Sequence, residues 1–168
     1  MLFRSRRFDE AGPLLERAIT LVERQRGRDA DDLVYFTSNL ALVRAAQRRM
    51  ADADALFGRA AAIARKVDHP MLGPVLTDRA NLWCRMGHTA EGLALTTEAA
   101  KAVARDHRDT AWRGAWVQNV RGGCLLAAGR GQEGLALVRQ SLPPLEKRWA
   151  ANTMIGAAAR SRLTGAAR

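Results

Sequence analysis

The only stretch that matches a motif with known chemistry is Gly129-Arg130-Gly131-Gln132-Glu133-Gly134. Its glycine spacing is that of a dinucleotide-binding loop, in which a strand leads into a helix whose N-terminus holds a pyrophosphate. The preceding residues, 116–128, are apolar at helical rather than strand spacing. Because no strand precedes the glycines, we interpret them as a turn between two helices and predict no nucleotide cofactor.

The other residue types that catalyse reactions or bind metals are scattered. His69, His88 and His107 lie far apart, and none has a cysteine or carboxylate at the spacing of a metal site or a catalytic triad. Acidic residues such as Asp52 and Glu91 fall at predicted helix starts, where a negative charge stabilises the helix dipole. We therefore predict turn positions for the histidines, no catalytic residues, no metal and no enzymatic activity.

The two cysteines, Cys84 and Cys124, lie in separate apolar stretches. Neither has a second cysteine or a histidine at metal-ligand spacing, and two cysteines do not form the disulfide framework of a small secreted domain. We expect no disulfide and a reducing, cytoplasmic location. The basic first seven residues are not followed by the apolar core of a secretory signal, and no apolar run is long enough for a membrane span, so we predict no membrane association.

Composition favours a helical protein with a basic surface. Hydrophobic residues make up 48% of the 168 positions but aromatic residues only 5%, and there are five prolines. A core of Ala, Leu, Val and Ile with few helix breakers is typical of packed helices. Lys and Arg exceed Asp and Glu by 27 to 17, a net charge of +10. Without a basic stretch interleaved with aromatic residues, we favour a solvated helical surface over a nucleic-acid site.

A pattern of small residues recurs four times along the chain. Ala11, Ala53, Gly92 and Gly134 are 42, 39 and 42 residues apart. Each is followed after three residues by a leucine, and four further on by another small residue; the leucines are Leu14, Leu56, Leu95 and Leu137, and the small residues are Ala18, Ala60, Ala99 and Ser141. Small residues at this spacing share one side of a helix and let a second helix approach closely, with the leucines filling the space beside them.

A second series of small residues lies on the helix before each turn. Ala41, Ala80, Gly122 and Ala158 each come seven residues ahead of a predicted turn residue, Arg48, Gly87, Gly129 or Gly165. Each repeat is therefore expected to be a first helix, a tight turn and a second helix. The predicted helices cover residues 8–26, 32–48, 51–67, 71–86, 89–106, 110–128, 131–148 and 151–164.

Residues 39–47, Asn-Leu-Ala-Leu-Val-Arg-Ala-Ala-Gln, and residues 50–60, Met-Ala-Asp-Ala-Asp-Ala-Leu-Phe-Gly-Arg-Ala, resemble the longer tetratricopeptide repeat (TPR) of kinesin light chains and many bacterial signalling proteins. The resemblance implies an all-α fold, an α-α superhelix or TPR solenoid of about eight antiparallel helices. It implies a single repeat domain, 1–168, with units 1–26 (incomplete), 32–67, 71–106, 110–148 and 151–168 (incomplete). Residues 106–163 resemble, more faintly, the C-terminal repeats of some bacterial serine/threonine kinases.

The resemblance also implies a function. In this family the first helices line a concave groove that holds a peptide, so we expect a protein-protein interaction scaffold with a protein or peptide partner. The groove would be lined by Tyr35, Ser38, Asn39, Leu42, Thr77, Asp78, Asn81, Arg85, Trp116, Asn119 and Arg162. The asparagines would bind peptide backbone, and Arg85 and Arg162 would pair with acidic groups. The alternatives are a regulatory or oligomerising segment of a larger signalling protein, such as a kinase, and a basic nucleic-acid-binding repeat.

Two predictions concern apolar residues. Leu14, Leu15 and Ile19 belong to a repeat with no preceding helix to cover them, which predicts a homo-oligomer through this end or a longer parent protein. Among the tryptophans, Trp83 is expected in the core. Trp112 and Trp116 are one turn apart and should form a single patch, for which packing is favoured over binding.

Overall fold

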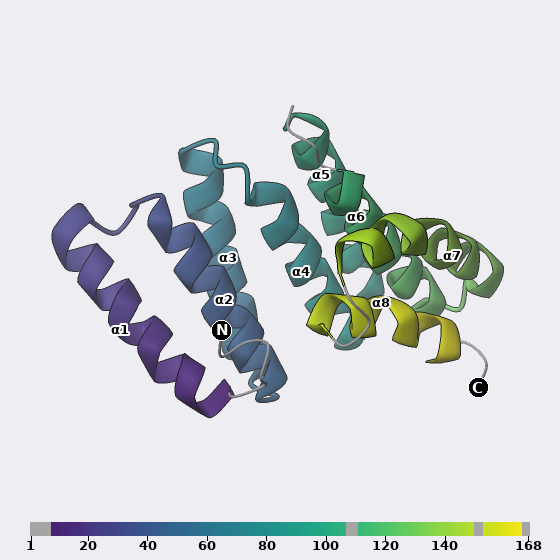
Figure 1. Cartoon of the computed structure of the whole chain (residues 1–168), viewed down its shortest axis with the longest axis horizontal. Coiled ribbons are helices and arrows are strands. Elements are labelled where there is room, and N and C mark those ends of the chain that lie inside the picture. The colour runs from purple at the N-terminus through teal and green to yellow at the C-terminus, as the bar shows by residue number, and fades with distance from the viewer. Residues whose placement is uncertain (1–7, 107–110, 150–152, 166–168) are drawn as a thin grey trace. The chain divides into compact units, whose positions relative to one another are not determined.

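The computed structural model describes residues 8–106, 111–149 and 153–165, and every regular element within them is an α-helix (Figure 1). The helices are α1 (Phe8–Arg26), α2 (Asp32–Ala46), α3 (Met50–Lys66), α4 (Leu72–Arg85), α5 (Thr89–Ala104), α6 (Ala111–Ala127), α7 (Gly131–Arg148) and α8 (Met154–Gly165). All eight predicted helices are confirmed, with bounds that agree to within a few residues. The predicted start of α8, at residues 151 and 152, lies outside the described residues.

The chain divides into two compact units, Met1–Val75 and Leu76–Arg168, with the boundary inside α4. In unit 1, α2 packs between α1 and α3. In unit 2, α6 packs against α5 and α7, and α8 packs against α7 and α6. Measured against the length and hydropathy that a bilayer-spanning helix requires, every described helix falls short.

The turns within the repeats are closed by residues in the left-handed backbone region. Arg48, Gly87 and Gly129 have φ values of 64°, 90° and 78°. The next residue then donates its N–H to a carbonyl five positions earlier, as from Arg130 to Leu125 at 2.8 Å. This geometry satisfies a carbonyl at the helix end and stops the helix. Three of the four predicted turn positions are therefore confirmed, including the one that is not glycine, whereas the fourth, Gly165, is the last residue of α8.

The small residues allow the helices of a pair to touch. A Cβ atom placed on Gly122 of α6 would lie 2.8 Å from the carbonyl oxygen of Gly134 on α7, and one placed on Gly134 would lie 2.7 Å from that of Gly122. Ala60 and Ala99 are 0% exposed and Ser141 is 1% exposed, so these repeat positions lie between helices as predicted, while Ala18 is only partly buried. The nesting of paired helices on small residues is confirmed.

The leucines and the first helix differ from the prediction. Leu56, Leu95 and Leu137 are only half-buried, and Leu14 is 54% exposed, because the small residues rather than the leucines form the contact between helices. Ile19, predicted to have no preceding helix to cover it, is nevertheless buried, and the helix that α1 packs against is the following one, α2. Self-association through this end remains a prediction.

Candidate functional site

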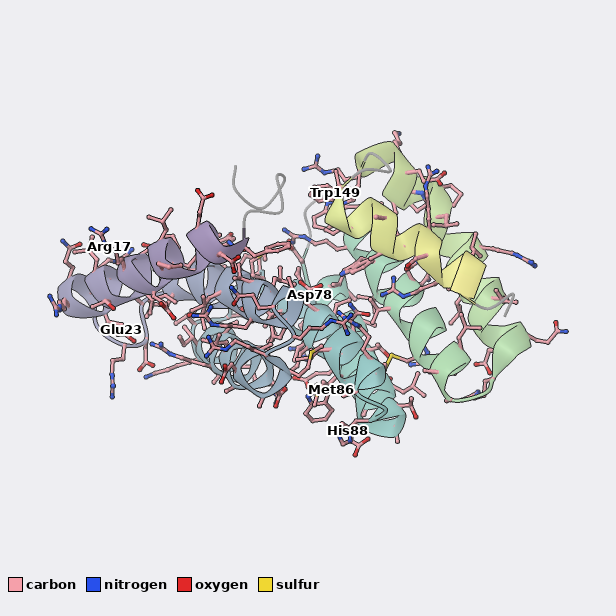
Figure 2. The ribbon with its side chains drawn as sticks, turned by 90° about the horizontal axis from the view of Figure 1, so that it is seen from below. Arg17, Glu23, Asp78, Met86, His88 and Trp149 are labelled. Carbon is pink, nitrogen blue, oxygen red and sulfur yellow. A yellow bond between two sulfur atoms is a disulfide. The ribbon has the colours of Figure 1, made fainter. Side chains whose placement is uncertain are left out.

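Five of the predicted groove residues converge in unit 2. Asp78 and Asn81 lie three residues apart on α4, and Trp116 and Asn119 three apart on α6, so each pair shares one helix face. The fifth, Arg162, comes from α8. Figure 2 labels Asp78 toward the start of α4, with Met86 and His88 marking the end of that helix. We call these five residues the polar cluster.

The side chain of Arg162 contacts residues of three helices: α4, α6 and its own helix, α8. Its guanidinium donates to Asn119 Oδ1 at 2.5 Å, to Asn81 Oδ1 at 2.7 Å and to the Ala158 carbonyl of its own helix at 3.1 Å. Its Cζ lies 5.1 Å from the centroid of the Trp116 ring, a cation–π distance. The guanidinium thus has hydrogen-bond acceptors at its edge and an aromatic ring at its face.

A second layer of hydrogen bonds fixes the groups that surround Arg162. Trp116 Nε1 donates to Asp78 Oδ1 at 3.0 Å, which sets the plane of the indole ring. Asn119 is 0% exposed and donates its Nδ2 to Ser141 Oγ at 3.0 Å, while Ser141 donates to the Val138 carbonyl at 2.8 Å. Since its nitrogen is used in this way, the amide of Asn119 must turn its oxygen toward Arg162.

The two charges of the cluster are both perturbed by burial. Burial raises the pKa of Asp78 to about 6, although the hydrogen bond from Trp116 and the charge of Arg162 act in the opposite direction. Burial lowers the pKa of Arg162 to about 10, with the charge of Asp78 raising it and that of Arg85 lowering it further. Both groups are therefore predominantly ionised at neutral pH, and the cation of Arg162 is compensated by groups of its own chain.

A cavity of about 480 Å³ adjoins the cluster, because Asn81 and Arg162 line both. The side chain of Arg85, one turn beyond Asn81 on α4, is exposed and also lines the cavity. The remaining lining residues are small or apolar: Cys84, Gly123, Cys124, Leu126, Ala127, Gly129, Gly131 and Leu135.

A disulfide between Cys84 of α4 and Cys124 of α6 forms part of the cavity wall. The prediction of two unpaired cysteines is therefore wrong. The cysteines therefore no longer support a location in a reducing cytoplasm, because disulfides persist mainly in oxidising compartments. The sequence did contain a signal: the separation of 40 residues is close to the repeat period, so stacked repeats bring the two positions together.

The other predicted groove residues are placed differently. In unit 1, Tyr35 is 45% exposed, with its ring edge-on to His69 at 5.1 Å between centroids, and Asn39 is exposed. Ser38 is buried and donates to the Tyr35 carbonyl, and Leu42 is partly buried. In unit 2, Thr77 is fully buried. Ser38 and Thr77 are thus buried rather than exposed, and the assignment of a groove remains a prediction.

One of the tryptophan predictions needs a correction. Trp83 is only partly buried, and its ring centroid lies 4.9 Å from the guanidinium carbon of Arg79, so it is not a core residue. Trp112 packs edge-on against Trp149, with 5.7 Å between the ring centroids. Trp116 is 5% exposed and belongs to the hydrophobic core cluster of unit 2, against which Trp149 also packs, so packing, the favoured interpretation, is confirmed for Trp116.

The motifs excluded by sequence lie in turns. The glycine motif begins in the turn after α6, which ends at Ala127, and continues into the first turn of α7, which begins at Gly131, so its interpretation as a turn between two helices is confirmed. His69 accepts a hydrogen bond from the Met71 N–H in the turn before α4, and His88 directly precedes α5. His107 lies outside the described residues. Across residues 8–106, 111–149 and 153–165, no three His, Cys, Asp or Glu side chains gather as metal ligands would.

The geometry of the repeats can be compared with known proteins. No protein-family model matches the sequence, and a search of curated proteins finds no match. Among solved structures, the chain is similar to BtubC (BKLC) from P. vanneervenii, with a TM-score of 0.71 and 16% identity over 84% of this chain, which spans 58% of that protein.

It is also similar to the kinesin light chain nearly identical TPR-like repeats of Podosopora anserina, with a TM-score of 0.67 and 19% identity, covering 98% of this chain and 80% of that one. A single-substitution variant of the same repeats gives a TM-score of 0.68 and 19% identity. This chain is therefore an all-α protein of TPR-like helical repeats. At these identities the likeness shows the fold, which is the fold that the repeat pattern predicts.

Proposed function

We propose that this chain is a protein-interaction scaffold that binds a segment of a partner polypeptide on the face formed by α4, α6 and α8. The observation that supports this most directly is the cavity of about 480 Å³, which lies between helices of successive repeats. Three of the predicted groove residues, Asn81, Arg85 and Arg162, line it. Proteins of TPR-like fold are generally associated with protein interaction, which favours a polypeptide ligand.

The lining of the cavity indicates what it would hold. Glycine and alanine residues leave room beside the apolar side chains of Leu126 and Leu135, and the exposed Arg85 adds a cation at the same cavity. Arginine is enriched at protein interfaces because its planar group binds carboxylates through paired hydrogen bonds. We expect an aliphatic side chain of the partner in the cavity and an acidic one at Arg85.

A site-specific photo-crosslinker tests this proposal. The crosslinking amino acid p-benzoylphenylalanine replaces Arg85 in one protein and the exposed Arg139 of α7, which does not line the cavity, in a control. After irradiation in lysate of the source cells, the proposal predicts a discrete protein adduct from position 85 that position 139 does not give. The adduct should be removed by protease and resist nuclease.

Two results would count against the proposal. Equal adducts from both positions would mean that the cavity has no special role. An adduct removed by nuclease, together with binding of short RNA that weakens steeply with salt, would replace the scaffold by a nucleic-acid-binding repeat.

A further inference from the structure

The polar cluster has the chemistry of a receptor for one particular group. The guanidinium of Arg162 donates to two amide oxygens, from Asn81 and Asn119, and lies over the ring of Trp116. The negative charge of Asp78, which accepts a hydrogen bond from Trp116, acts on it electrostatically. We propose that these four side chains form a guanidinium-binding site that α8 fills with Arg162, and that a partner segment bearing an arginine competes with α8 for it. The second half of this statement rests on the function proposed above.

The site selects a guanidinium over other cations by its geometry. Arg162 reaches Asn119 Oδ1 with Nη1 and Asn81 Oδ1 with Nη2, so two different nitrogens of one planar group are used at once. A lysine ammonium is a compact point charge and cannot present that fork while also lying flat on an indole ring. Anions are disfavoured, because Asn81 and Asn119 present amide oxygens and the nearby Asp78 adds a negative charge.

Two of the groups that surround Arg162 are held by contacts independent of it. Asn119 donates to Ser141, and Trp116 donates to Asp78. Pre-oriented groups bind more tightly because less conformational freedom is lost on binding. Because these contacts do not involve Arg162, we expect Asn119 and Trp116 to keep their orientation when Arg162 is withdrawn.

The site also has room for an arginine stem. A Cβ atom placed on Gly123 would lie 2.5 Å from Arg162 Nε and 2.8 Å from its Cδ, so glycine at this position makes the channel along which the stem runs. The cavity beside it shares Asn81 and Arg162 and provides the approach for a second side chain.

The resident helix is short enough to be displaced. α8 has 12 residues, and an isolated helix of that length is marginal in water, so α8 depends on its contacts with the rest of unit 2. Its apolar residues Ile155, Ala158 and Ala159 pack with the core cluster of that unit, and Arg160 pairs with Glu146 at the surface. Arg162 adds partly buried hydrogen bonds to these contacts.

Chemical rescue tests the site in the whole 168-residue chain. Arg162→Ala empties it, and Arg160→Ala is the matched control, since it removes an exposed cation from the same helix. We expect ethylguanidinium to raise the melting temperature of Arg162→Ala saturably, on the order of 2–4 °C. Ethylammonium and N-ethylurea, which lack the planar fork or the charge, should not do so. Wild type and Arg160→Ala should show no saturable rise, and Asp78→Asn added to Arg162→Ala should abolish it.

A folded Arg162→Ala protein without a saturable response to ethylguanidinium overturns the proposal. Far-UV circular dichroism establishes that the variant is folded, and Arg162→Gln, which keeps a hydrogen-bond donor, replaces it if it is not. Competition is tested with a synthetic peptide of residues 153–165 and its form with citrulline for Arg162. The arginine peptide should bind Arg162→Ala at least tenfold more tightly than it binds wild type, and the citrulline peptide should bind neither; equal binding of both peptides refutes recognition of the guanidinium.

The two experiments distinguish the two proposals. Rescue by ethylguanidinium without a protein adduct at position 85 would support the guanidinium site and refute the scaffold function. A protein adduct without rescue would support the scaffold function and refute the guanidinium site.

Discussion

Reduction of the Cys84–Cys124 disulfide is expected to remove a large part of the free energy of unfolding of unit 2. The bond closes a loop with a sequence separation of 40 residues between α4 and α6. In the chain-entropy treatment, releasing a loop of this length from the unfolded state lowers the free energy of unfolding by about 4 kcal/mol. Domains of this size are commonly stable by only about 5–15 kcal/mol, so the effect should be plain in a denaturation curve.

Tryptophan fluorescence reports this effect selectively. Trp83, Trp112, Trp116 and Trp149 all lie in the sequence of unit 2 and none lies in unit 1. Urea unfolding followed by fluorescence, with and without dithiothreitol, therefore gives the free energy of unfolding of the unit that contains the bond. Mass spectrometry after alkylation of the unfolded, unreduced protein establishes beforehand that both sulfurs are blocked.

The matched control is the Cys84→Ala/Cys124→Ala protein, whose stability should not respond to dithiothreitol. If oxidised and reduced wild type unfold with free energies that differ by less than about 1 kcal/mol, the loop-closure reasoning is refuted. A thiol count of two in the oxidised protein would refute the disulfide itself.

Three further predictions concern individual side chains. Gly92→Ala places a Cβ atom far inside van der Waals contact with Cys84 Sγ, so it should lower the free energy of unfolding in urea by about 1–3 kcal/mol. The loss should be smaller in a protein in which both cysteines are alanine, and equal losses in the two backgrounds would contradict the prediction. Asp78 has a folded pKa of about 6, above its ordinary 3.8, so the folded state binds the extra proton and stability from this group falls as pH rises through 6. Lowering the pH from about 7 to about 5 should therefore add about 1 kcal/mol in wild type that Asp78→Asn lacks, and identical pH dependence in the two proteins would count against the assignment. Phe57 is 1% exposed in unit 1, so Phe57→Ala should lower stability by about 3–5 kcal/mol in a circular dichroism melt, and a change below about 1 kcal/mol would show that the site is not packed as described.

The helices and turns of this protein could be predicted because they depend on neighbouring residues. The apolar spacing sets each helix, and the turn residues Arg48, Gly87 and Gly129 set where helices stop. The recurrence of small residues then identified the pairs that touch, since only small side chains allow the backbone approach seen between Gly122 and Gly134. The fold class follows from these local rules.

Part of the candidate site could also be predicted, for a related reason. The pairs Asp78–Trp116, Asn119–Arg162 and Asn81–Arg162 are separated by 38, 43 and 81 residues, close to one or two repeat periods. Repeat stacking brings such positions together. Applied to the cysteines, the same rule would have predicted the disulfide, at a separation of 40.

The repeat pattern alone determined which residues share a helix face and which helices pair. Only the tertiary structure decided what those residues bind: it turned Arg162 toward the amides of Asn81 and Asn119 instead of toward solvent, and it joined the two cysteines. The physical reason is that the energy of a buried guanidinium depends on the orientation of acceptors supplied by other helices. Helical periodicity places a side chain on a face, but the partners that it meets there are fixed only when the helices pack.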